Sequence, residues 1–382
     1  MRVPLRLTTH GAAPRPASTD SPAPAPVGAD ETPEVRPPDI VGGVAAGETV
    51  GVILLGPGGP ARLREAEGYV ARLVSDPRRV PLALLPGPLR RTLGRALGRM
   101  RRPRLVRELR ALGGQSPEAA HTADVAAALE RTLNRRTFPA VVWQVTTAFR
   151  YGGRTLDDAR ADLAACGVDR VLVVPFAPPG LTAVAASLRE AWTESGGDAG
   201  ALVPLPPLAD ALADAVRERM CEAMQRFPPQ ARASVHVLYA IHPAARFDSG
   251  VPDAAPRAAV LRPLAADPDL PAAQHVAFGR TWGLALQAAP GVEDEMAALA
   301  AAGVRSLLVV PIGYLCDTLD IAYELDIAMR GRGLDLGMLH IEVAAAIGPH
   351  ADLLDALAEC LANALGVDTP TAAVPPAARR AA

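Results

Sequence analysis

Short apolar runs alternate with amphipathic stretches along most of the chain. Runs rich in branched residues lie at 50–55, 139–146, 170–174, 235–241 and 307–310, with weaker ones at 201–204, 276–286 and 336–343. Segments with apolar residues three and four positions apart lie between them, at 61–75, 90–112, 117–134, 156–166, 181–194, 207–227, 260–266 and 350–365. Buried strands that alternate with amphipathic helices predict an α/β fold with parallel sheets.

Two segments of the chain resemble each other closely. Residues 163–178 read LAACGVDRVLVVPFAP and residues 299–314 read LAAAGVRSLLVVPIGY. Each has a helix end, a glycine cap, a buried strand and a proline stop, which indicates an internal duplication. We expect two similar Rossmann-like halves, each a small parallel sheet flanked by helices, with a cleft between them that suits a small molecule.

The expected boundaries follow from this duplication and from composition. The first half should span 47–179 and the second 180–345, and the helix of 346–366 should pack back on the core. The remaining segments, 1–46 and 367–382, are rich in Pro and Ala and lack apolar periodicity. Such segments cannot bury enough apolar surface to order themselves, so we expect two disordered tails.

Composition narrows the classes of function. The 382 residues are 49% hydrophobic and 21% charged with a net charge of -2, which fits a globular protein and gives no basic patch for nucleic acid. The four cysteines are far apart and form no C-x-x-C, so a zinc or iron–sulfur site on close cysteines is unsupported. The sequence shows neither a membrane-spanning run nor a signal-peptide core, so we expect a cytoplasmic protein. A peripheral contact with a membrane stays open.

The richest candidate chemistry lies between Arg305 and Ile327. The buried run ends at Pro311 and Gly313, and helical spacing is expected from Cys316 onward. Asp317, Asp320 and Glu324 are three and four residues apart, so they would form an acidic stripe on one face of that helix. The stripe starts at the carboxyl end of a strand, where open α/β sheets bind ligands. A solvated helix face is the alternative.

His242 follows the strand of 235–241 directly. Free imidazole titrates at about pH 6.5, so a neutral histidine there can accept a proton. A histidine base that faces an acidic stripe suits proton removal, metal delivery, or both. A turn histidine with a satisfied ring is the alternative.

Other strand ends also carry candidate groups. Arg150 follows the strand of 139–146 and would hold a substrate carboxylate bidentately, unless it forms a loop salt bridge. The turn GPGGP at 56–60 lets the backbone approach a flat ligand, but it lacks the G-x-G-x-x-G and Walker patterns of nucleotide sites. No G-x-S-x-G and no evident Cys–His pair supports a serine or cysteine hydrolase.

The chain from about Val50 to Leu365 resembles the ferrochelatases, which insert ferrous iron into a porphyrin. GVILLGPGGP (51–60) is similar to their opening strand and L-N-x-G-x-P turn, and LGGQSP (112–117) to I-G-G-G-S-P. AFRYGGRTL (148–156) is similar to A-M-R-Y-G-x-P-S-I, and VLYAIHP (237–243) stands at F-S-A-H-G-L-P. YLCDTLDIAYELDI (314–327) stands at F-V-S-D-x-x-E-T-L-x-E-I-D-I. The motifs occur in the family's order and spacing.

The resemblance implies iron insertion in haem biosynthesis, with iron as a substrate and no organic cofactor. It implies that His242 takes the pyrrole protons and that Asp320 occupies the position of the catalytic glutamate, both of them next to the metal. Asp317 and Glu324 would line a path for protons or metal. Arg150, Tyr151 and Pro57 would bind the substrate.

The chain also departs from the family pattern. Asp320 is one methylene shorter than the family's glutamate, and Gly56 replaces an asparagine. APPGLTAVAAS at 177–187 replaces a segment rich in aromatic and hydroxyl side chains. The new segment favours an alternative: a diverged enzyme for another tetrapyrrole, metal or small molecule. Asp320 favours another: a binder of porphyrin, haem or metal without turnover. The choice between protoporphyrin and coproporphyrin stays open.

Overall fold

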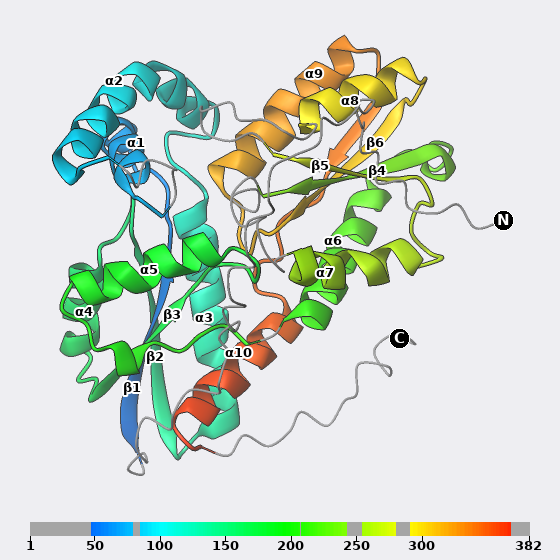
Figure 1. Ribbon diagram of the computed structural model, residues 1–382. Coiled ribbons are helices and arrows are strands. Elements are labelled where there is room, and N and C mark those ends of the chain that lie inside the picture. Colours follow the sequence, from blue (N-terminus) through cyan, green and yellow to red (C-terminus); the bar gives the residue numbers. More distant parts are fainter. Residues whose placement is uncertain (1–46, 79–84, 207, 243–253, 280–290, 368–382) are drawn as a thin grey trace, which may run out of the picture.

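The computed structural model describes residues 47–78, 85–206, 208–242, 254–279 and 291–367 (Figure 1). The two expected tails therefore lie outside the described residues, apart from Val367. The described part is an α/β fold with two separate parallel sheets, as predicted.

The first sheet has the strand order β2-β1-β3. All pairs are parallel, and Val52 of the central strand lies beside Val145 and Leu172. Helix α3 covers one face, and α4 and α5 cover the other (Figure 1). The bounds are β1 (Glu48–Gly56), α3 (Glu118–Thr137), β2 (Val141–Phe149), α4 (Leu156–Ala165), β3 (Arg170–Pro175) and α5 (Thr182–Glu194).

The second sheet has the order β5-β4-β6-β7 and is also parallel. Helices α6 and α7 lie on one face, and α8 and α9 on the other (Figure 1). The bounds are α6 (Ala209–Gln225), β4 (Val235–Ile241), α7 (Ala254–Ala266), β5 (Gln274–Phe278), α8 (Val292–Ala301), β6 (Ser306–Ile312), α9 (Met329–Asp335) and β7 (His340–Val343).

The two sheets match strand for strand. Each begins with its central strand, adds the next strand on one side and the third on the other. Leu202 then forms a single parallel bridge with Val173 of β3, at the place that β7 takes beside β6. Since the segment up to Leu202 completes the first sheet, we propose to move the boundary between the halves from 180 to a position after this bridge.

One hydrophobic core runs through both halves. Val50 and Leu172 of the first sheet belong to the same buried cluster as Val237 and Leu308 of the second. Leu357 of α10 (Ala351–Ala364) lies in it too, because this helix packs against both α3 and α6. Because the two sheets share this core, the ends of their strands are held at fixed positions relative to each other.

Helices α1 (Ala66–Ser75) and α2 (Gly87–Ala111) form a hairpin above the first sheet (Figure 1). A Cβ at Gly98 would lie only 2.6 Å from the carbonyl oxygen of Glu67, so the helices approach closely there. Leu319, just before the acidic helix, joins the buried cluster of this hairpin. The hairpin thereby connects the first half to the acidic segment of the second.

The acidic helix differs from its prediction. It begins at Asp320, not Cys316, and residues Asp320–Ala328 (η5) form a π-helix that continues into α9. π-helical hydrogen bonds run from residue i to i+5, so the α-helical spacing rule does not hold there.

Smaller differences concern the weak strand signals. The run at 201–204 forms one bridge and no strand, β7 starts at His340 and not at 336, and most of 276–286 lies outside the described residues. The described residues also include three short 3-10 helices: η1 (Leu63–Glu65), η2 (Ala199–Ala201) and η3 (Arg232–Ser234).

Candidate functional site

A pocket forms where strand ends of both sheets converge. Gly56 ends β1, Phe176 follows β3, His242 follows β4 and Gly313 follows β6, and all four line this His242 pocket. The carboxyl ends of parallel strands are the usual place for a ligand in α/β proteins. The cleft expected between the halves is therefore present, with the predicted histidine in its wall.

The position of His242 is fixed by the second sheet. Its backbone N–H donates to the carbonyl oxygen of Ile312 at 2.9 Å, which extends the pairing of β4 with β6. Its ring lies against Tyr314, with ring centroids 4.7 Å apart and the planes tilted by 54°. The residue is half-buried, so the imidazole is oriented by packing and still reaches the pocket.

The first half contributes a carboxylate that the sequence motifs did not indicate. Glu118, the first residue of α3, is 8% exposed and lines the pocket. Its Oε1 accepts a hydrogen bond of 2.9 Å from the N–H of Gly58, in the turn where Pro57 also lines the pocket. Gly58 has a φ of +78°, and a Cβ there would lie 2.2 Å from the carbonyl oxygen of Gly152, so this turn requires glycine. The only sequence signal was an acidic residue directly after the LGGQSP turn.

Asp317 lies in the loop before the helix, not on the helical face that the sequence predicted. Its Oδ1 accepts from the N–H of Ala346 at 2.9 Å, and its Oδ2 is 3.3 Å from Nδ1 of His121. Asp317 therefore connects the loop that follows β7 with helix α3. It is not among the residues that line the His242 pocket.

The other two acidic residues share the π-helix. Asp320 is its first residue and is half-buried, outside the lining of the His242 pocket. Glu324 accepts from Arg104 of α2 at 2.7 Å, and Arg104 also bonds the buried Glu108 at 2.6 Å. The expected stripe is thus divided between a loop residue and two helix residues, one of which pairs with a cation.

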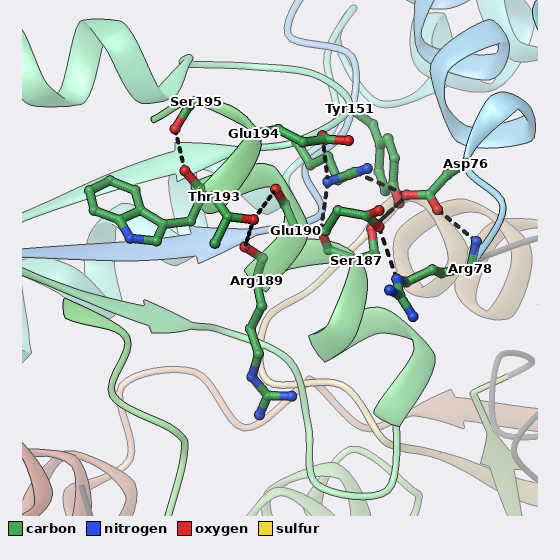
Figure 2. A network of polar contacts seen from close by, with 11 residues as sticks. Asp76, Arg78, Tyr151, Ser187, Arg189, Glu190, Thr193, Glu194 and Ser195 are labelled. Atoms are coloured by element: carbon green, nitrogen blue, oxygen red, sulfur yellow. Dashed lines mark hydrogen bonds and ion pairs between the residues drawn. The ribbon is translucent and has the colours of Figure 1, made fainter. Parts of the chain in front are cut away.

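The side chain of Tyr151 lies in a buried polar network (Figure 2), which Arg150 joins through Asp76, and neither residue lines the His242 pocket. Tyr151 and Ser187 hydroxyls both donate to Oδ2 of Asp76 at 2.6 Å, and Nε of Arg150 lies 2.9 Å from the same oxygen. Arg150 also donates to the carbonyl oxygen of Ser187 at 2.6 Å. The arrangement matches the salt-bridge alternative for Arg150, and substrate binding by this pair stays a prediction.

The backbone of the same pair nonetheless shapes the pocket. The N–H of Arg150 donates to the oxygen of Gly56 at 3.1 Å, and that of Tyr151 to the oxygen of Pro57 at 2.9 Å. The turns that follow β1 and β2 are therefore joined by two backbone hydrogen bonds.

A second pocket adjoins the first. It encloses about 360 Å³, is lined by apolar side chains such as Leu212, Val216 and Val260, and shares Gly313 and Tyr314 with the His242 pocket. The His242 pocket itself encloses only about 50 Å³. Ligand pockets usually hold about 300–1,000 Å³, so a flat macrocycle needs its walls to separate.

Cys316 provides a test of how closed the pocket is. Burial, with the neighbouring carboxylates of Glu118 and Asp317, raises the pKa of this thiol to about 12 against a lowering hydrogen bond from Thr122. The thiolate is the nucleophile, so we expect iodoacetamide to modify exposed Cys166 in the native protein and Cys316 only after denaturation. Peptide mass spectrometry reads both sites, and rapid native labelling of Cys316 would contradict the closed pocket.

Two features are absent from the described residues. No group of three or more His, Cys, Asp or Glu side chains there is arranged to hold a metal ion. In the same part of the chain, no helix is both long and apolar enough to cross a membrane.

Comparison with known proteins agrees with this geometry. The family model described as ferrochelatase matches residues 49–365. The chain is 26% identical to a ferrochelatase of Parasynechococcus marenigrum (strain WH8102), over 83% of each chain. It is 27% identical to one of Geotalea uraniireducens (strain Rf4), over 83% of this chain and 97% of that protein. Since the family model covers most of the 382 residues, the chain belongs to the ferrochelatase family.

Proposed function

We propose that this protein inserts ferrous iron into a porphyrin in haem biosynthesis. The observation that carries the proposal is the His242 pocket, which the strand ends of both sheets line within a chain of the ferrochelatase family. Iron is a substrate here, and the proposal requires no organic cofactor. A cytoplasmic location stays a prediction.

The physical obstacles to metalation define the roles. A porphyrin is flat and stiff, and its two central N–H protons block the metal. His242, oriented by Tyr314 and by the pairing of β4 with β6, would take a pyrrole proton and approach the incoming iron. The pocket's apolar wall of Phe176, Leu181 and Val184 would contact the face of the ring and exclude water.

Asp320 and the neighbouring carboxylates have a different proposed role. Asp320 and Glu324 lie on the π-helix and Asp317 in the loop before it, all outside the pocket lining. We propose that they conduct protons out or iron in, because carboxylates can accept and release protons and because their oxygen atoms allow a bound metal ion to exchange. Direct ligation of iron by His242 and Asp320 requires the pocket to open first.

The decisive experiment is anaerobic metalation by the purified full chain. Fe²⁺ or Zn²⁺ is offered with protoporphyrin and, separately, with coproporphyrin, and the absorbance of the metallated ring is followed. We expect turnover with one of the two porphyrins, which also names the substrate. A flat trace from a folded protein would contradict the proposal.

A binder without turnover is the second candidate. The absence of Asp320 from the pocket lining favours it, since the family's catalytic carboxylate is then not in place. Fluorescence titration of a porphyrin distinguishes the two: saturable binding with no metalation means a binder, and neither binding nor metalation means another substrate.

A further inference from the structure

The proposed reaction releases two protons for each metal ion that is inserted. A free porphyrin carries two central N–H groups, and its metal complex carries none, so each Fe²⁺ that binds displaces two protons with no change of oxidation state. A neutral imidazole has one acceptor nitrogen and takes one proton at a time. His242 alone would have to release the first proton before it accepts the second.

Only one carboxylate among the described residues lines the His242 pocket, and it is Glu118. The three acidic residues expected from the motifs lie outside that lining. Asp317 is held by the N–H of Ala346, and Glu324 by Arg104.

The fold holds Glu118 firmly in place. It is the first residue of α3, where the helix dipole favours an ionised carboxylate. Its Oε1 accepts a hydrogen bond of 2.9 Å from the backbone N–H of Gly58. The next residue of this turn, Gly59, has no room for a side chain, because a Cβ added there would lie 2.4 Å from Oγ of Ser116. A buried carboxylate held by a backbone bond in a ligand pocket is positioned for proton transfer.

A second group in the same pocket indicates a ligand. The Oγ1 atom of Thr318 is buried and has no hydrogen-bond partner in the described part of the chain. Thr318 lines the His242 pocket together with Glu118. Buried polar atoms are usually satisfied, so an unsatisfied hydroxyl in a pocket points to a polar partner that arrives with the ligand.

We propose that Glu118 is the second proton acceptor of the metalation reaction, a role that rests on the proposed function. One pyrrole N–H gives its proton to an imidazole nitrogen of His242, and the other gives its proton to the Glu118 carboxylate. The two nitrogen lone pairs released in this way bind Fe²⁺. Both protons then leave to solvent. In this proposal α3 supplies the carboxylate at the ring, and Asp320 keeps the role proposed above in moving protons or iron.

Glu118→Gln is the sharpest test. Glutamine keeps an oxygen for the Gly58 N–H and loses only the basicity, so the fold and the KM for porphyrin should not change. We expect kcat to fall by about 100-fold, a typical contribution of a general base. Glu130→Gln is the matched control, because Glu130 also lies on α3 and accepts a backbone N–H, from Val145 at 2.8 Å, outside the pocket lining.

The outcomes separate the two proposals. Loss of kcat in Glu118→Gln, with an unchanged melting temperature and full activity in Glu130→Gln, supports the assignment. Near-normal kcat in Glu118→Gln with loss in Asp320→Asn overturns the assignment and leaves the proposed function intact. A wild-type chain that metallates no porphyrin overturns the proposed function itself, and the role of Glu118 with it.

Discussion

His242→Ala is expected to reduce porphyrin metalation by at least about 100-fold, because it removes a general base and the nitrogen that approaches the metal. The fold should remain intact. The backbone N–H that pairs with Ile312 is present in alanine too, and the half-buried ring packs against Tyr314 at the edge of the pocket and not in the centre of the sheet. The measurement is kcat for Fe²⁺ or Zn²⁺ insertion, with the melting temperature as the check on folding.

His340→Ala is the matched control. His340 is also half-buried and sits in the same sheet, but it pairs with Ser306 at the amino end of the strands, away from the pocket. We expect this variant to retain the wild-type rate. Retained turnover in folded His242→Ala would remove the histidine from the mechanism.

The fold could be predicted because its signals are local and repeated. The repeated segments at 163–178 and 299–314 became β3 and β6, which occupy equivalent places in the two sheets. Buried parallel strands read as continuous apolar runs, and Val235–Ile241 was predicted at its observed bounds. The boundary between the halves was harder, since a single bridge at Leu202 carries little sequence pattern.

The π-helix shows why the acidic stripe was predicted imperfectly. Spacing rules assume α-helical turns, and nothing in TLDIAYELDI distinguishes i→i+5 from i→i+4 bonding. The segment makes tertiary contacts: Leu319 is buried against the α1–α2 hairpin, and Arg104 of that hairpin bonds Glu324. These contacts join residues more than two hundred positions apart, which no local pattern reports.

The same limit explains Glu118 and the Arg150–Tyr151 pair. Arg150 and Tyr151 follow a strand at the pocket edge, as the sequence indicated, yet their side chains turn to Asp76, a residue that no motif marked. Glu118 reaches the pocket because α3 starts beside the turn after β1. A motif places a backbone near a site, but distant partners decide where each side chain points.

Asp76→Ala is expected to destabilise the protein by about 3–5 kcal/mol, the usual result of removing one partner from a buried ion pair. Asp76 is 4% exposed and receives the Tyr151 and Ser187 hydroxyls and the Arg150 guanidinium. Its loss leaves these buried donors without that acceptor. Denaturant unfolding followed by circular dichroism measures the change, and Asp157→Ala, a 90% exposed partner of Arg160, should stay within about 1 kcal/mol.

The pH dependence of stability gives this prediction a signature of its own. Burial acts to raise the pKa of Asp76, but the hydrogen bonds from Ser187 and Tyr151 outweigh it, so the folded-state pKa lies below the ordinary value. The stabilisation is therefore complete above the unfolded pKa of about 3.9 and is lost as the pH falls toward the folded value. Wild-type stability should fall more steeply than that of Asp76→Ala below about pH 4, since only the wild type takes up a proton at this carboxylate when it unfolds. The prediction is contradicted if the unfolding free energies of the two proteins change in parallel with pH and if Asp76→Ala loses little stability at pH 7. The end of α1 would then be held against α5 by packing alone.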